Sequence, residues 1–254
     1  MGALVIVATP IGNLSDTSPR ALEALRNADL IACEDTRQTL KLLNHFGIQK
    51  PLTSYHDFNE TTKAAALGEK VGEGLTVALV ADAGTPAISD PGYRLVRYCQ
   101  EHGFPVKVIP GPNAAIAALA ASGLPSDEFF FAGFLPSKKS ARRQKLDSLR
   151  LLPATLIFYE APHRIEGTLA DLLEVFGDRE TCVARELTKI HEEILFGKLS
   201  EILGKVKPLG EFVIVIGGQT ASDKPPSKQP LTREQVLRQL GISRNELYDL
   251  FFRK

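Results

Sequence analysis

The sequence predicts an α/β fold, and three observations lead to this prediction. Short β-branched runs alternate with helical patterns along the first half of the chain, an order typical of a mainly parallel sheet with helices on both faces. Some of these runs, such as Leu4–Ala8, are apolar at every position, as in strands that are buried on both faces. A second series of strands and helices begins after Gly123-Leu124-Pro125, so we expect a domain boundary within Asn113–Leu124.

The first series has clear helix start and stop signals. Ser18 precedes Pro19, a good N-cap followed by proline at the first helical position. Gly47 and Gly103 each follow a helical pattern and are expected to end it. In chain order, the expected elements are the strand Leu4–Ala8, the helix Pro19–Ala28, the strand Leu30–Cys33, the helix Arg37–Phe46, the strand Pro51–Tyr55, the helix Thr62–Val71, the strand Val77–Ala81, the helix Tyr93–His102 and the strand Val106–Ile109.

The second series follows a helix at Ala114–Ala121 that is small and apolar on all sides, which suits burial between two layers. The expected strands are Phe129–Phe131, Thr155–Tyr159, Cys182–Ala184 and Phe212–Ile216, and the expected helices are Arg142–Leu151, Ile165–Phe176 and Leu199–Val206. Residues 220–230 are typical of a solvated linker. Thr232 with Gln235, and Ser243 with Glu246, are spaced as capping boxes and predict two short tail helices. The expected divisions are residues 1–113, 114–219 and 220–254.

Composition narrows the functional classes. The 254 residues include 30 Lys+Arg and 30 Asp+Glu, and this neutral total weakens a claim of generic polyanion binding but permits a local basic patch. Cys33, Cys99 and Cys182 are far apart, so neither a disulfide framework nor a zinc site is indicated. We find no basic leader and no run of the ~20 apolar residues that a membrane span needs. We therefore expect a cytoplasmic protein with no membrane association.

Familiar catalytic signatures are missing from the sequence. No G-x-G-x-x-G follows a strand and no G-x-x-x-x-G-K-[ST] occurs, which argues against a dinucleotide oxidoreductase and a P-loop ATPase. His191-Glu192-Glu193 lacks the second histidine of a zinc protease helix, and no G-x-S-x-G elbow occurs. We see no metal-ligand cluster and predict no metal.

Turn residues gather instead at the ends of expected strands. Pro10–Asn13, Asp82–Gly92 and Pro110–Ala114 each follow a strand of the first half. Loops at the carboxyl ends of parallel strands border the ligand crevice of an open sheet. Any one of these loops is more simply explained as a tight β-to-α turn, but three loops at one edge favour a pocket.

Polar residues also follow strands in the second half, in Phe158–Arg164 and Ala184–Lys189. They could face the first half across a cleft. Structural ion pairing between layers is an equally good explanation of Glu160, Arg164, Arg185 and Glu186. His163 alone is better explained as a hydrogen-bonded residue at a helix start than as a general base.

The longest motifs carry a family resemblance. VATPIGNLSD, IACEDTRQTLKLLNHFGI, DAGTPAISDPG, PGPNAAIAAL, GFLPSKK, FYEAPHR and ARELTKIHEE, in this order, resemble the ribosomal RNA 2′-O-cytidine methyltransferases of the tetrapyrrole methylase superfamily. The similarity runs from about Leu4 to about Gly217. It implies two α/β/α domains, a cleft between them that binds S-adenosyl-L-methionine, usually a homodimer, and 16S rRNA of the 30S ribosomal subunit as substrate.

The resemblance also implies which residues contact the methyl donor. They are Pro10, Gly12, Gly84, Thr85, Pro86, Ile88, Asn113, Ala114, Phe158, Tyr159, Ala184, Arg185, Phe212 and Val213. Thr85 stands where tetrapyrrole methylases have the acidic residue of a Gly-Asp-Pro loop, which argues against a tetrapyrrole substrate.

A ribose hydroxyl is a weak nucleophile and benefits from a nearby base. Glu160, Glu186, Lys189 and Asp90 are candidates, and the sequence does not choose among them. We take Glu160 and Glu186 as the expected catalytic residues.

A basic segment predicts the RNA surface. Lys138, Lys139, Arg142, Arg143 and Lys145 place five cations in eight positions, with His163 and Arg164 expected at the cleft rim. A solvated basic helix start is the structural alternative, but cations at a helix N-terminus oppose its dipole, whereas phosphate contact offers a reason for them.

Two other functions remain open at this point. The chain could be a tetrapyrrole or other small-molecule methyltransferase on the same fold. It could also be a non-catalytic ribosome-assembly factor that keeps the pocket only as structure.

Overall fold

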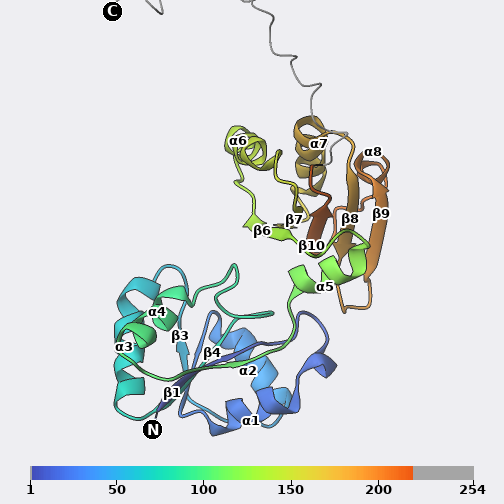
Figure 1. Cartoon of the computed structure of the whole chain (residues 1–254). Coiled ribbons are helices and arrows are strands. Elements are labelled where there is room, and N and C mark those ends of the chain that lie inside the picture. Colours follow the sequence, from blue (N-terminus) through green and yellow to red (C-terminus); the bar gives the residue numbers. More distant parts are fainter. Residues whose placement is uncertain (1, 220–254) are drawn as a thin grey trace, which may run out of the picture. The chain divides into compact units, whose positions relative to one another are not determined.

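The computed structural model describes residues 2–219, and residues 1–218 form one compact unit. Its strands form two five-stranded sheets (Figure 1). The first sheet uses strands between residues 3 and 109, and the second uses strands between 129 and 216. The predicted α/β class is confirmed. The linker expected at residues 220–230 and the two tail helices lie outside the described residues.

The first sheet is entirely parallel, in the order β3-β2-β4-β1-β5. Its strands are β1 (Ala3–Val7), β2 (Leu30–Cys33), β3 (Leu52–Ser54), β4 (Thr76–Val80) and β5 (Val106–Ile109). The connecting elements are the short 3₁₀ turn η1 (Leu14–Asp16), and the helices α1 (Pro19–Asn27), α2 (Thr36–His45), α3 (Glu60–Gly72) and α4 (Tyr93–Glu101). This is the parallel sheet that the alternation predicts.

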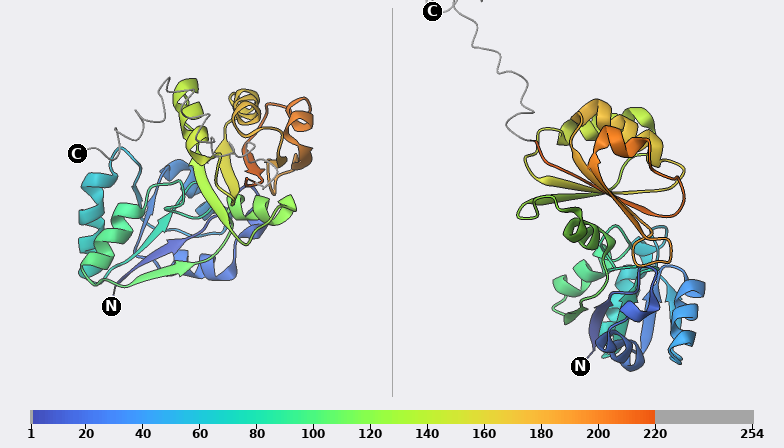
Figure 2. Two further views of the ribbon diagram at one scale, coloured as in Figure 1. Left: turned by 45° about the horizontal axis from the view of Figure 1, so that its top comes forward. Right: turned by 90° about the vertical axis from the view of Figure 1, so that its right-hand side faces the viewer.

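Helices cover both faces of this sheet, as Figures 1 and 2 show. Val5 and Val7 of β1 pack with residues of α1 and α2. Leu4, on the opposite face of the same strand, packs with residues of α3 and α4. A strand that is apolar at every position is required here because both of its faces are buried.

The predicted start of α1 is confirmed in atomic detail. The Ser18 hydroxyl accepts a hydrogen bond from the Ala21 backbone N–H at 3.1 Å, and Pro19 occupies the first turn. One N–H that the helix itself leaves unpaired is thereby satisfied.

The second sheet is mixed, in the order β6-β7-β10-β8-β9, and only its β6–β7 pair is parallel. Its strands are β6 (Phe129–Phe134), β7 (Thr155–Glu160), β8 (Glu180–Arg185), β9 (Glu193–Lys198) and β10 (Phe212–Ile216). The helices α6 (Lys139–Leu149), α7 (Ile165–Phe176) and α8 (Leu199–Leu203) pack on one face, and α5 (Ala114–Ser122) packs on the other.

The second half differs from the sequence-based expectation in three elements. Strand β9 was not expected, although its alternately exposed side chains are typical of a half-buried edge strand. Helix α6 begins at Lys139, three residues before the expected start at Arg142. Helix α5 is buried on one side only: Ala118 is buried but Ile116 is 49% exposed.

The two sheets are separated in sequence at α5, where we expect the domain boundary. The division into residues 1–113 and 114–219 stays a prediction. Among the described residues, no helix has both the length and the apolarity that crossing a bilayer requires.

Candidate active site

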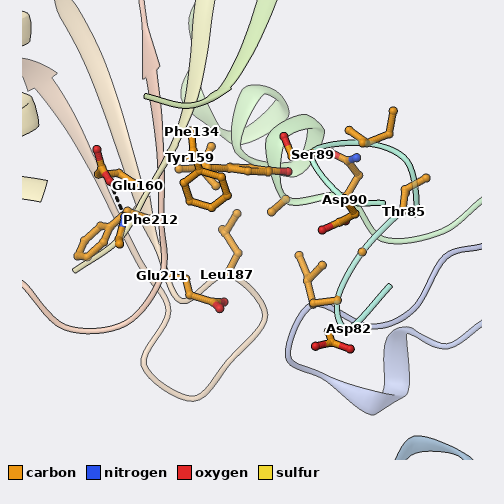
Figure 3. Close-up of a pocket in the computed structure, with 18 of the residues that line it drawn as sticks. Asp82, Thr85, Ser89, Asp90, Phe134, Tyr159, Glu160, Leu187, Glu211 and Phe212 are labelled. Atoms are coloured by element: carbon orange, nitrogen blue, oxygen red, sulfur yellow. Dashed lines mark hydrogen bonds between the residues drawn. The ribbon is translucent and has the colours of Figure 1, made fainter. Parts of the chain in front are cut away.

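A pocket of about 500 Å³ lies at the ends of strands from both sheets (Figure 3). This volume is in the range of small-molecule sites. Its lining residues are Ile11, Glu34, Asp82, Ala83, Gly84, Thr85, Ile88, Ser89, Asp90, Asn113, Ala114, Phe134, Tyr159, Glu160, Ala161, Pro162, Ala184, Leu187, Glu211, Phe212 and Val213. Carboxylates and apolar side chains therefore share one cavity.

The first half reaches the pocket through the loops that follow β1 and β4. These strands are neighbours, but α1 and α4 pack on opposite faces of the sheet. Diverging connections open a crevice at the carboxyl ends of the strands. Thr9 and Gly84 close the crevice floor with reciprocal backbone hydrogen bonds of 2.9 and 3.1 Å, and the Thr85 hydroxyl donates to the Pro112 carbonyl at 3.0 Å. The three predicted loops are thus brought together.

Gly84 has a backbone φ of +86° where it lines the pocket. Most side chains are strained at this angle. Glycine therefore lets the loop turn here, and a Cβ at this position would lie 3.5 Å from the Ile11 side chain and 3.8 Å from the Pro112 carbonyl oxygen.

Strand alternation selects which residues of the second half face the pocket. Val213 is paired with Tyr159 on one side and with Ala184 on the other. All three pack on the α5 side of the sheet and line the pocket. Phe158, one residue earlier, is fully buried in the core beneath the opposite face.

Aromatic side chains hold Tyr159 in place. Its ring lies 5.1 Å from that of Phe131 and 5.5 Å from that of Phe134, between centroids. Its hydroxyl accepts the Ala115 backbone N–H at 3.2 Å. Burial raises the pKa of the Tyr159 hydroxyl, so the group stays protonated at neutral pH.

The structure places nine of the predicted donor-binding residues in the pocket wall: Gly84, Thr85, Ile88, Asn113, Ala114, Tyr159, Ala184, Phe212 and Val213. Pro10, Gly12, Pro86, Phe158 and Arg185 are not part of that wall. Pro10 and Pro86 are buried, and Gly12 lies against the side chain of Lys189. Arg185 is paired with Glu193, with 3.0 Å between Nε and Oε2.

Three carboxylates of the first half line the pocket: Glu34, Asp82 and Asp90. Asp82 and Asp90 belong to a loop that the sequence places at the crevice, whereas Glu34 is not among the expected site residues. Glu34 directly follows β2, and Asp82 comes two residues after the end of β4. A position at the carboxyl end of a parallel strand, the signal that identifies the loop beginning at Asp82, could also have identified Glu34.

Asp90 has an unusual electrostatic environment. Burial, and then the negative charges of Glu34, Asp82 and Asp57, raise the pKa of Asp90 to about 7. Burial, followed by the charges of Asp82 and Asp57, also raises the pKa of Glu34. Strongly shifted carboxyl groups in a cleft are candidates for function.

Glu160 also lines the pocket, but its carboxylate is held by other protein groups. It accepts hydrogen bonds from the Thr168 hydroxyl at 2.6 Å and from the Ala161 backbone N–H at 2.8 Å. Arg164 Nε lies 3.1 Å from its Oε1. These contacts favour the structural alternative for Glu160.

Glu186 lies outside the pocket wall. Its Oε1 accepts hydrogen bonds from Lys189 Nζ at 2.8 Å and from the Glu211 backbone N–H at 2.9 Å. The hydrogen bond from Lys189 is the main reason why the pKa of Glu186 is lowered. These contacts favour the structural alternative for Glu186 as well. Lys189 is held in turn by Glu186 and Glu211.

The basic segment divides into exposed and internal charges. Lys138, Lys139, Lys145 and His163 are exposed. Arg142 is buried, with its Nε 2.7 Å from Asp171 Oδ2. The expectation that Arg142 faces RNA is wrong, because its charge is neutralised inside the protein.

Arg143 and Arg164 also have internal partners. Arg143 Nε lies 2.8 Å from Asp171 Oδ1, and a second nitrogen pairs with Glu174. Arg164 donates to the Leu135 carbonyl at 2.6 Å, besides its pairing with Glu160. Both arginines therefore contribute to packing within the second half rather than to an open basic surface.

Comparison with known proteins identifies the family. The family described as Tetrapyrrole (Corrin/Porphyrin) Methylases matches residues 3–203. A protein of Halalkalibacterium halodurans named ribosomal RNA small subunit methyltransferase I is 51% identical over 88% of this chain and 78% of its own length. A protein of the same name from Thermotoga maritima is 48% identical over 86% of this chain and 100% of its own length.

Solved structures agree with the fold. A diphthine synthase structure has a TM-score of 0.65 at 17% identity, covering 86% of this chain and 91% of its own. A Thermus thermophilus uroporphyrin-III C-methyltransferase, solved in complex with S-adenyl homocysteine, has a TM-score of 0.59 at 20% identity, covering 85% and 97%. The chain therefore belongs to the tetrapyrrole methylase family, and it is an S-adenosylmethionine-dependent methyltransferase with relatives named ribosomal RNA small subunit methyltransferase I.

Proposed function

We propose that this enzyme transfers a methyl group from S-adenosyl-L-methionine to the ribose 2′-hydroxyl of a cytidine in 16S rRNA. The observation that carries the proposal is the pocket itself, in which Glu34 and Asp82, with no ion pair among residues 2–219, share one cavity with apolar side chains of the second half. The names of relatives that are about half identical in sequence supply the rRNA part of the proposal.

The pocket residues fit a sulfonium donor. The donor is positively charged at sulfur, and the carboxylates of Glu34 and Asp82 make the first-half wall negative. Leu187 and Val213 offer apolar contact on the other side. Gly84 contributes to the pocket wall without a side chain. When bound, the donor supplies an activated methyl group.

The chain's own contribution is positioning and exclusion of water. Methyl transfer needs nucleophile, methyl carbon and sulfur in line, and holding reactants in such a geometry supplies much of a rate enhancement. Leu187 is buried and Tyr159 is fixed by its aromatic neighbours. These rigid side chains can hold the donor and the ribose in one orientation.

The exposed cations Lys138, Lys139 and Lys145 support contact with RNA phosphates. They lie at the start of α6 and along its exposed side. Such contacts position RNA without reading its sequence. His163, exposed just before α7, is proposed as a rim contact.

The proposal includes the small (30S) ribosomal subunit as substrate, a cytoplasmic location and a homodimer. Apolar side chains exposed on the edge strands β5 and β6 and on α5 support self-association: Val108, Ile116, Phe129 and Phe130. Exposed apolar patches on a protein surface often mark a protein–protein interface, where association buries them.

The test is methyl incorporation from tritiated S-adenosyl-L-methionine into 30S subunits that lack the modification. Free 16S rRNA and a precorrin substrate are the parallel reactions. Digestion to nucleosides should give labelled 2′-O-methylcytidine from 30S subunits. The proposal would be overturned by label on a base or by label only on the precorrin. It would also be overturned if the donor binds but no methyl group is transferred to any of the three substrates.

A further inference from the structure

Asp90 projects into the pocket from the loop that follows β4. It lies between Ser89 and Pro91, and its carboxyl group is on the pocket side of the loop (Figure 3). Among residues 2–219, no hydrogen bond and no ion pair is found for this carboxylate. It is therefore available to a ligand, unlike the carboxylate of Glu160.

The charged groups around Asp90 come from several elements. Glu34 follows β2, Asp57 precedes α3 and Asp82 follows β4, and all three act on Asp90 as negative charges. On the second-half side, Tyr159 carries a neutral hydroxyl, and Glu160 and Glu211 line the same cavity. Each of those two glutamates has a cationic partner.

This environment keeps Asp90 close to half-ionised at neutral pH. Burial and the three carboxylates together bring its pKa to about 7. A general base is most effective when its pKa lies near the working pH, because it is then both deprotonated and sufficiently basic.

The loop that carries Asp90 is constrained on both sides. Ala87 and Ser89 have φ values of +65° and +63°, which is uncommon for residues with a side chain and is tolerated only where the surroundings enforce it. Gly133 of β6 allows this loop to approach closely, since a Cβ there would come within 2.9 Å of Ser89 Oγ. The residue that precedes Asp90 is therefore packed closely against β6.

We propose that Asp90 is the proton acceptor for the ribose hydroxyl in the methyl transfer. The hydroxyl oxygen forms the new bond to the methyl carbon, and the carbon–sulfur bond breaks with its electron pair remaining on sulfur. The hydroxyl proton passes to the Asp90 carboxylate and later to solvent. This inference rests on the proposed 2′-O-methylation.

The test compares wild type with Asp90→Asn in single turnovers on 30S subunits at saturating donor. The variant should lose at least ~100-fold in rate, the scale of general base catalysis. Its donor affinity, measured by calorimetry, should stay within about threefold because the hydroxyl's proton is not part of donor binding. Asp127→Asn, an exposed aspartate outside the pocket, is the matched control and should behave as wild type.

The pH profile separates a proton acceptor from a structural role. The wild-type rate should fall on the acid side of about pH 7, following the pKa of Asp90. Glu34→Gln should move this limb to lower pH, because one of the charges that raise the pKa is removed. The limb should be missing from the residual activity of Asp90→Asn.

Distinct outcomes address the two proposals. If wild type makes 2′-O-methylcytidine but Asp90→Asn keeps its rate, or if Glu34→Gln leaves the acid limb in place, the inference about Asp90 is overturned and the proposed function stands. Loss of donor affinity in proportion to rate would also overturn it, because Asp90 would then bind the donor. If wild type makes no 2′-O-methylcytidine, the proposed function itself fails.

Discussion

Carboxylates line both walls of the pocket, but the two walls differ in whether these carboxylates are ion-paired. On the first-half wall, Glu34, Asp82 and Asp90 form no ion pair among the described residues. On the second-half wall, Glu160 is paired with Arg164, and Glu211 with Lys189 at 2.9 Å. Unpaired charges in a cavity cost stability and are retained where chemistry uses them. The presence or absence of a cationic partner, rather than the residue type, therefore distinguishes a structural carboxylate from a reactive one.

The largest effect on stability should come from breaking the ion pair between Glu160 and Arg164 on the second-half wall. Glu160→Gln leaves Arg164 without its carboxylate partner, and breaking a buried ion pair in this way costs about 3 kcal/mol. Chemical denaturation should show this loss of unfolding free energy. The single-turnover rate of the folded variant, measured well below its Tm, should stay within about threefold of wild type because Glu160 is not the proton acceptor. A hundredfold slower rate at full stability would reverse the roles of the two walls.

The next largest effect should come from a substitution of Gly84 in the pocket wall. In Gly84→Val, a β-branched residue at a φ of +86° costs on the order of 2 kcal/mol of stability. The side chain should also hinder the donor and weaken its binding at least tenfold, or about 1.4 kcal/mol. Gly103→Val is the matched control, since Gly103 has a φ of +69°, lies outside the pocket, and leaves open space of 4 Å around the position that a Cβ would take. Equal donor affinity in both variants, by calorimetry, would show that the pocket is misplaced.

A substitution of Asp90, on the first-half wall, should raise the free energy of unfolding rather than lower it. The pKa of Asp90 is raised in the folded protein to about 7, against about 3.9 in an unfolded chain. The folded state therefore binds the proton more tightly, and stability falls as pH rises from about 4 to about 7. Asp90→Asn removes this cost.

After allowance for the partial exposure of Asp90, the variant should be about 1.5 kcal/mol more stable than wild type at pH 8. The two proteins should have nearly the same stability at pH 4. Urea titrations of both proteins at the two pH values provide the measurement. An Asp90→Asn variant that is less stable than wild type at pH 8 would mean that Asp90 has a stabilising partner.

The smallest effect concerns the exposed lysines. Replacing Lys138, Lys139 and Lys145 by alanine should weaken 30S binding roughly fivefold and lower the salt-dependence slope by about two, because fewer counterions are released. Donor affinity should not change. The exposed Lys41, Lys70 and Lys205 form a control set of the same size. If both sets weaken binding equally, the effect is one of net charge rather than of this surface.

Much of the fold could be predicted because local signals agreed with the tertiary structure. The sequence pattern located β5, α7 and β10 at their observed ends, and Ser18 marks the start of α1. Strand β9 was missed because it is short, exposes its apolar residues Ile194 and Phe196, and is followed directly by α8. Such short alternating runs are ambiguous without the neighbouring strand.

The site was harder to predict than the fold. Three loops at one sheet edge correctly located the pocket, but ion pairing depends on contacts between residues distant in sequence. Arg142 pairs with Asp171 across 29 positions, which no local pattern reveals. The same holds for Asp90, since its raised pKa comes first from burial and then from the charges of Glu34, Asp82 and Asp57, two of which lie on other loops.

The central claim, that the reactive carboxylate belongs to the first-half wall, can be tested by titrating carboxyl groups directly. Carbon-13 NMR of protein labelled at aspartate side-chain carboxyls would follow each group from pH 3 to pH 9, with Asp90→Asn providing the assignment. We expect one resonance with a midpoint at about 7, lost in Asp90→Asn and kept in Glu160→Gln. A midpoint for Asp90 at about 4, the ordinary aspartate value, would contradict the account.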